Sequence, residues 1–199
     1  ARISEKHSET AFMTNRAMEF IEDSSDKPWF LHLSYIKPHW PYIAPAPYHN
    51  MFSQNQFNQV QRNEKQKENM NPVYKAFVET RVSKTFSKDE VRNTVMSGYM
   101  GLIKQIDDNL GRLFDFLEKK GNMKDTMIIF TSDHGDYLGD HWLGDKELFH
   151  EQIVKVPMII YDPREMANKT RGKKEKRFVE AIDLLPTFLD AVGSKESKH

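Results

Sequence analysis

Three short apolar runs, separated by segments with helical periodicity, constrain the fold of this chain more than any other feature. The runs cover residues 29–33, 127–130 and 156–161. Each has the length and apolar character of a buried strand, and Pro157 places the last one at the outside of a sheet. Helices are expected over residues 8–22, 87–121 and 183–191. Strands that alternate with helices predict an α/β fold with a mostly parallel sheet flanked by helices.

The second of these helices is the most clearly marked. Ser87 and Glu90 match a capping box, apolar residues follow at helical spacing, and Gly121 stands where a C-terminal glycine is expected. Asp107 and Asp108 lie within this helix, where adjacent side chains point about 100° apart. We therefore interpret these two carboxylates as part of a solvated face and not as a catalytic pair.

The charge balance excludes two classes of function. The 199 residues include 29 Lys and Arg and 29 Asp and Glu, so the chain has no bulk positive charge for binding nucleic acid or an anionic membrane surface. No apolar run approaches the length of a membrane span. The absence of cysteine excludes disulfides and thiolate metal sites within this chain. It opens with neither a start Met nor a signal peptide, so the compartment is unknown and a longer parent protein is expected.

One domain is predicted for residues 1–199, with a polar surface excursion at about residues 53–72. Residues 37–47 hold four prolines and must form an ordered loop after the first strand, because proline removes helix and sheet hydrogen bonds. The basic run at residues 171–177 is interpreted as a solvated loop.

Two strand ends carry residues suited to chemistry, and ligands gather at such ends in α/β sheets. At the end of the 127–130 strand, Asp133 and His134 can both reach one divalent cation if the chain turns sharply, as Gly135 would permit. Two ligands do not complete a metal site, so others must come from elsewhere. Alternatively, Asp133 merely caps the turn and His134 is exposed. A third possibility is a zinc site made by the three histidines His134, His141 and His150, although the spacing matches no compact zinc pattern.

His39 and Lys146 are the remaining candidates. Prolines on both sides would hold His39 rigidly, which suits a general acid or base, although it could equally be a packed loop histidine. Lys146 lies between Asp145 and Glu147, so a surface ion pair is the alternative to a role with substrate.

Three ordered motifs together resemble the sulfatase family of the alkaline phosphatase superfamily. The motifs are the segment FTSDHGDYLGDH at residues 130–141 followed by Lys146, the segment VPMI at residues 156–159, and the segment KPHWPY at residues 37–42. The details are most similar to the branch of phosphonate monoester hydrolases, next to the arylsulfatases. The resemblance covers nearly the whole chain, and three motifs in order are far more specific than any one of them.

The resemblance implies a fold, an activity and a set of roles. The fold is part of a three-layer, alkaline-phosphatase-like sandwich, and residues 1–199 are part of a sulfatase catalytic domain. Asp133 and His134 match two metal ligands, and the cofactor is one divalent ion, with Ca²⁺, Mn²⁺, Mg²⁺ and Zn²⁺ all open. Lys146, thirteen residues after Asp133, matches the lysine that contacts the sulfuryl or phosphoryl group. His39 matches the histidine that contacts the ester and protonates the leaving oxygen.

One part of the family pattern is missing from this sequence. The family makes its formylglycine nucleophile from Cys or Ser in a C/S-x-P-x-R motif, which is absent here together with two further aspartate ligands. We expect the chain alone to be inactive, and the whole enzyme, a candidate homo-oligomer, to hydrolyse small sulfate esters. The alternatives are a phosphonate monoester or phosphodiester hydrolase, and a non-catalytic binding or scaffold domain with the same fold.

Overall fold

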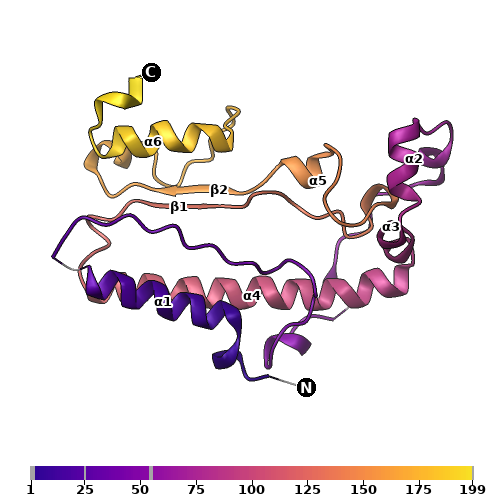
Figure 1. The fold of residues 1–199 in the computed structure, drawn as a ribbon, viewed down its shortest axis with the longest axis horizontal. Helices are drawn as coiled ribbons and strands as arrows, with labels where there is room; N and C mark the ends of the chain where they lie inside the picture. The colour runs from indigo at the N-terminus through magenta and orange to yellow at the C-terminus, as the bar shows by residue number, and fades with distance from the viewer. Residues whose placement is uncertain (1–2, 25, 54–55, 199) are drawn as a thin grey trace.

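Two helices, α1 (Glu9–Asp23) and α4 (Asp89–Lys119), lie side by side and form one layer of the molecule (Figure 1). The computed structural model describes residues 3–24, 26–53 and 56–198. Above this layer run the strands β1 (Ile128–Thr131) and β2 (Met158–Tyr161), and beyond them lies helix α6 (Leu184–Ala191). The shorter α-helices are α2 (Pro72–Val78), α3 (Arg81–Phe86) and α5 (Glu151–Val154). Short 3-10 helices include η2 (Tyr48–Asn50), η4 (Glu64–Lys67) and η5 (Asp140–Trp142).

The predicted helices at residues 8–22 and 183–191 are confirmed, and Ser8 caps α1 by accepting a hydrogen bond from the Ala11 amide at 3.2 Å. The capping box predicted at Ser87 is wrong. Lys88 is the N-cap of α4, while Ser87 ends α3 and its hydroxyl donates to the carbonyl of Lys84 at 2.8 Å. The hydroxyl is therefore already used by the preceding helix.

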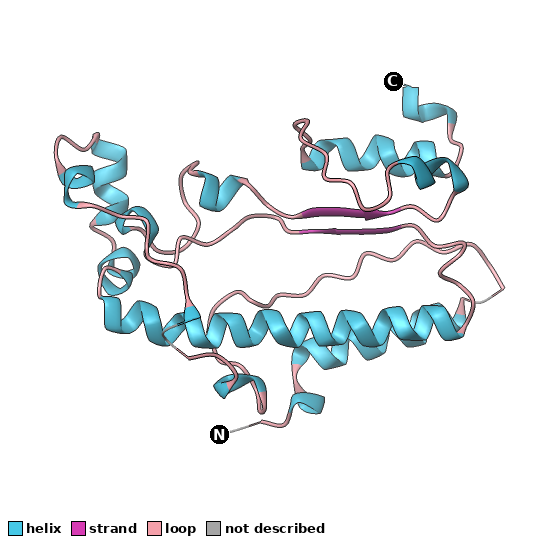
Figure 2. Ribbon diagram, turned by 180° about the vertical axis from the view of Figure 1, so that it is seen from behind, coloured by secondary structure: helices cyan, strands magenta, loops and turns pink. Residues whose placement is uncertain are grey.

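The layer between the helices contains an antiparallel strand pair, in which Ile129 lies opposite Ile160. The run at residues 29–33 is extended but is not a strand, because no described segment forms strand hydrogen bonds with it (Figure 2). Its alternate side chains Trp29, Leu31 and Leu33 pack against the core of α1 and α4.

The opposite face of this extended run contacts the third layer. Phe30 meets Phe188 of α6 edge to face, with ring centroids 5.4 Å apart. Helices thus cover both sides of the extended layer, which agrees with the predicted α/β fold. The mostly parallel sheet remains a prediction, since the strand pair in the described residues is antiparallel. None of the helices described here has the length and apolar character needed to cross a bilayer.

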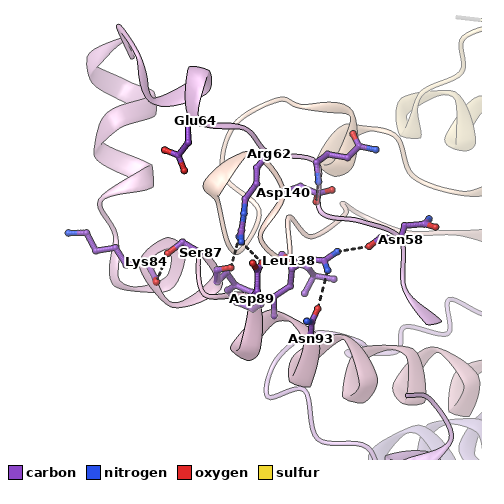
Figure 3. A network of polar contacts seen from close by, with 12 residues as sticks. Asn58, Arg62, Glu64, Lys84, Ser87, Asp89, Asn93, Leu138 and Asp140 are labelled. Carbon is purple, nitrogen blue, oxygen red and sulfur yellow. Dashed lines mark hydrogen bonds and ion pairs between the residues drawn. The ribbon is translucent and has the colours of Figure 1, made fainter. Parts of the chain in front are cut away.

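The polar excursion is held in place by two arginines (Figure 3). Arg92 of α4 donates to the carbonyls of Asn58 at 3.2 Å and Leu138 at 3.1 Å. Arg62 donates to the carbonyl of Phe86 at 3.1 Å and forms an ion pair with Asp89. The excursion is therefore attached both to α4 and to the loop that follows β1.

Candidate active site

The turn after β1 depends on Gly135. Its amide donates to the carbonyl of Ile153 at 2.8 Å, and a Cβ at this position would lie 1.8 Å from the carbonyl oxygen of Gln152. Glycine is needed here because another backbone segment approaches too closely for a side chain, and not because of a left-handed conformation. This contact holds the loop of residues 133–136 against the start of α5.

Asp133 and His134 present a pair of metal-ligating atoms at this turn. Asp133 Oδ2 lies 3.5 Å from His134 Nε2, and the Asp133 side chain is 83% exposed. His134 Nδ1 lies 2.7 Å from the carbonyl of Gly135, which can only accept, so Nδ1 carries the proton. Nε2 of the neutral ring is then left with a free lone pair, as in metal-bound histidines whose other nitrogen is held by a carbonyl. The two residues therefore fit one divalent cation.

The alternatives for these residues can be compared with the structure. Asp133 Oδ1 does accept the His134 amide at 2.9 Å, so this carboxylate caps its own turn with one oxygen and leaves the other available. The zinc alternative is not seen, because no three ligating side chains gather within the described part of the chain. His141 uses its ring nitrogens on Gln66 and Gln152, at 2.8 and 3.1 Å.

One ring nitrogen of His39 is fixed by a hydrogen bond, and the other has no partner among the residues that the structure describes. Its Nδ1 lies 2.9 Å from the carbonyl of Trp40 and must donate to it, and its ring lies beside the Trp40 ring with centroids 5.4 Å apart. A second proton would therefore reside on Nε2, which is the nitrogen able to pass it on. The arrangement is compatible with the predicted general acid.

Lys146 is half-buried, and its ammonium group has no ion pair or hydrogen bond within residues 3–24, 26–53 and 56–198. Only its backbone amide is bonded, to Glu147 Oε2 at 3.2 Å. The predicted alternative, a surface ion pair with a neighbouring acid, is not seen among these residues. A cation without a protein partner is free to hold an anionic ligand.

Tyr42 and Asp136 connect the loop that carries His39 to the loop that follows β1. The Tyr42 hydroxyl donates to Asp136 Oδ2 at 2.5 Å. No hydrogen bond or ion pair joins His39 or Lys146 to Asp133 or His134 in the described residues. The contact between the loops is thus made by neighbours of the predicted site residues.

The electrostatics of this contact follow from burial. Burial raises the pKa of the Asp136 carboxyl, the negative charge of Asp145 raises it further, and the hydrogen bond from Tyr42 opposes both. Burial and then Asp136 raise the pKa of the Tyr42 phenol, and burial raises the pKa of the adjacent Tyr99 to about 12. Tyr42 therefore stays a neutral donor at physiological pH. In the sequence both residues stand out only as members of motifs, because nothing local indicates a contact across 94 positions.

A family model for sulfatases matches residues 3–194. The chain belongs to the sulfatase family. It is 35% identical over 208 residues to the multifunctional alkaline phosphatase superfamily protein PehA of Trinickia caryophylli, covering 98% of this chain and 40% of that protein. It is 30% identical to the arylsulfatase of Clostridium perfringens, covering 91% of this chain and 37% of that enzyme.

A solved structure shows the same fold. The phosphonate monoester hydrolase of Agrobacterium radiobacter superimposes with a TM-score of 0.88 at 30% identity, over 96% of this sulfatase-family chain and 40% of that one. The chain thus spans about two fifths of the length of the relatives that it matches.

Proposed function

We propose that this chain supplies part of the active site of a metal-dependent hydrolase whose substrates are phosphonate monoesters and phosphodiesters. The observation that carries the proposal is the pair formed by Asp133 Oδ2 and His134 Nε2, 3.5 Å apart, with the other ring nitrogen held by a carbonyl. The pair would hold one divalent ion, which would neutralise negative charge that develops on the ester. The nucleophile and the remaining ligands are expected from another part of a longer protein.

Lys146 and His39 would have different roles because their side chains differ in chemistry. The Lys146 ammonium has no partner among the described residues, so it can bind the anionic oxygens of the ester group. The Nε2 of His39 can donate a proton to the leaving oxygen while Nδ1 stays bound to the Trp40 carbonyl.

The choice of substrate class rests on the relatives. The sequence favours sulfate esters first, whereas the TM-score of 0.88 at 30% identity to a phosphonate monoester hydrolase supports phosphonate monoesters. Sulfate esters are the second candidate, supported by the arylsulfatase match. Both classes present a tetrahedral anion to the same Lys146.

Metal content tests the proposal directly. In the full-length protein, Asp133→Ala and His134→Ala should each reduce bound divalent metal, measured by elemental analysis, and should reduce hydrolysis of aryl phosphonate and aryl sulfate esters in parallel. Asp115→Ala on the exposed face of α4 is the matched control and should change neither. Unchanged metal in both alanine variants would rule out the site. Absence of both metal and turnover in the wild-type protein would favour the non-catalytic binding or scaffold domain.

The dependence of kcat/KM on the leaving group tests the separate roles of His39 and Lys146. His39→Ala should damage alkyl esters far more than nitrophenyl esters, because nitrophenolate departs without a proton. Lys146→Ala should damage both equally, because both carry the same anionic centre. Each loss in kcat/KM should reach about two to four orders of magnitude. If the His39→Ala deficit does not depend on leaving-group pKa, His39 is not the acid.

A further inference from the structure

The loop that carries His39 is closed mainly on itself. The ammonium of Lys37 donates to the carbonyls of His39 and Pro41, each at 3.2 Å. The His39 amide donates to the carbonyl of Ile36 at 3.0 Å. These bonds determine the shape of the loop, but they do not determine where it lies relative to the metal-binding pair.

Tyr42 attaches this loop to the rest of the molecule. Its ring packs edge to face on Phe86 and Tyr99, with centroids 6.0 and 6.1 Å apart. Its carbonyl lies so close to α4 that a Cβ on Gly98 would be 2.4 Å from the oxygen. Its hydroxyl donates to Asp136 at 2.5 Å, and this hydrogen bond links the two loops.

Asp136 is suited to this contact because two donors meet its carboxylate. Oδ2 accepts from Tyr42, and Oδ1 accepts the Leu138 amide at 3.1 Å. Asparagine could keep both contacts only if its nitrogen donated to the Tyr42 hydroxyl, which can also accept, so removing the contact requires alanine. Asp136 follows Asp133 by three residues, so its position is coupled to that of the metal-binding pair.

We propose that the hydrogen bond from Tyr42 to Asp136 positions His39 relative to Asp133 and His134. This inference rests on the proposed function and names positioning residues for the same site. The two residues act through His39 and do not touch the substrate. Losing the bond should displace the His39 loop while leaving the metal-binding pair in place, because Gly135 still anchors that pair to Ile153.

The test compares Tyr42→Phe, Asp136→Ala and the double variant in the full-length protein. Each single variant should lower kcat for alkyl esters about 10- to 100-fold, the scale expected for misplacing a catalytic group by about 1 Å. Nitrophenyl esters, KM and metal content should change little. The double variant should be no worse than Asp136→Ala alone, because Asp136→Ala already removes the bond that Tyr42→Phe removes. Tyr99→Phe, which removes a hydroxyl from the ring beside Tyr42, is the matched control and should behave as wild type.

Hydrogen exchange provides a readout that does not depend on turnover. Amides of residues 37–43 should exchange faster in Tyr42→Phe, while those of α4 stay protected. The positioning role would be overturned if the exchange rates of residues 37–43 did not change. It would also be overturned if kcat fell equally for alkyl and nitrophenyl esters, or if the losses in kcat multiplied in the double variant. Failure of the wild-type protein to show metal-dependent hydrolysis would overturn the proposed function as well. Selective loss in His39→Ala without selective loss in Tyr42→Phe would overturn only the positioning role.

Discussion

The layer formed by α1 and α4 and the loop of residues 133–150 are held by different forces. In the helical layer, Ile21, Leu113 and Leu117 are buried to within 7% exposure and pack on one another. In the loop, five bulky or polar residues have left-handed backbones, with φ between 45° and 80°. These residues are Leu138, His141, Trp142, Asp145 and Leu148.

The difference shows whether nearby or distant residues determine each structure. A left-handed backbone costs about 1–2 kcal/mol per non-glycine residue, so the loop cannot be held by local preference. Bonds from distant residues hold it instead, among them Gly144 N to Ser83 Oγ at 3.2 Å and Gln61 N to Asp140 Oδ1 at 2.9 Å. Truncating a core side chain should therefore destabilise the helical layer. The loop should instead be destabilised by a side chain that crowds its backbone, or by the loss of a hydrogen-bonding side chain.

The largest loss of stability is expected from Leu117→Ala in the helical layer. Leu117 is 2% exposed, and removing it leaves a cavity between α1 and α4. The free energy of unfolding should fall by about 2–5 kcal/mol, as measured by chemical denaturation. Ile103→Ala, on the exposed face of the same helix, should change it by no more than about 0.5 kcal/mol. Similar costs for both variants would mean that this layer is not the stabilising core.

The next effect is expected from Gly135→Ala in the loop. A methyl group 1.8 Å from the Gln152 carbonyl must push two backbone segments apart, at a cost of about 1–3 kcal/mol. Gly111→Ala in α4 is the matched control, since nothing lies within 4 Å of the added Cβ. That control should stabilise the protein by about 0.5–1 kcal/mol. If both substitutions shift the unfolding temperature in the same direction, the Gln152 carbonyl does not crowd residue 135 as the structure shows.

The same contrast explains what the sequence predicts. Helical periodicity and Ser8 located α1, and apolar runs located β1 and β2, because these elements follow local patterns. The extended run at residues 29–33 has the alternation of a strand, but pairing requires a neighbour that no local pattern supplies. Helices α2 and α3 were not predicted, since they lie at the end of a polar segment and are short.

The residues of the candidate site also differ in whether a local sequence pattern predicts them. Asp133 and His134 could be named because they follow an apolar run that predicts a strand, and β1 is indeed formed there, although its residues are only partly buried. Asp136, which contacts Tyr42, could not be distinguished from any other loop carboxylate. Arg92 likewise gave no signal, because an arginine on an amphipathic helix is usually solvated, whereas here it is 7% exposed.

Arg92→Met should weaken the loop less than Gly135→Ala does. The change keeps the apolar stem but leaves the buried Leu138 carbonyl without the Nε donor at 3.1 Å. The cost should be about 1–2 kcal/mol in denaturation, with faster proteolysis near Asn58, whose carbonyl also loses its donor. Lys119→Met, in the exposed last turn of α4, is the control and should cost no more than about 0.5 kcal/mol. Equal costs would show that Arg92 contributes no specific bond.

The smallest effect expected is a pH dependence that originates at His150. Burial, followed by the nearby charge of His141, lowers the pKa of this imidazole below its usual 6.5. The two rings stack with centroids 4.2 Å apart, and the Tyr137 hydroxyl bonds His150 Nδ1 at 2.8 Å. Gln66 Oε1 accepts the Asn63 amide, and Gln66 Nε2 lies 2.8 Å from His141 Nδ1.

A lowered pKa fixes the sign of this dependence. The unfolded chain binds the proton more readily than the folded one, so the stability contributed by neutral His150 is complete above about pH 6.5. It is lost as the pH falls from there through the lower folded pKa. His150→Phe keeps an aromatic ring against His141 but cannot titrate, so its unfolding free energy should decline less between about pH 7.5 and about pH 5. Comparing the two slopes cancels the other titrating groups. Parallel slopes would show that His150 does not link loop stability to pH, and would leave the stacked pair as an apolar contact like those in the helical layer.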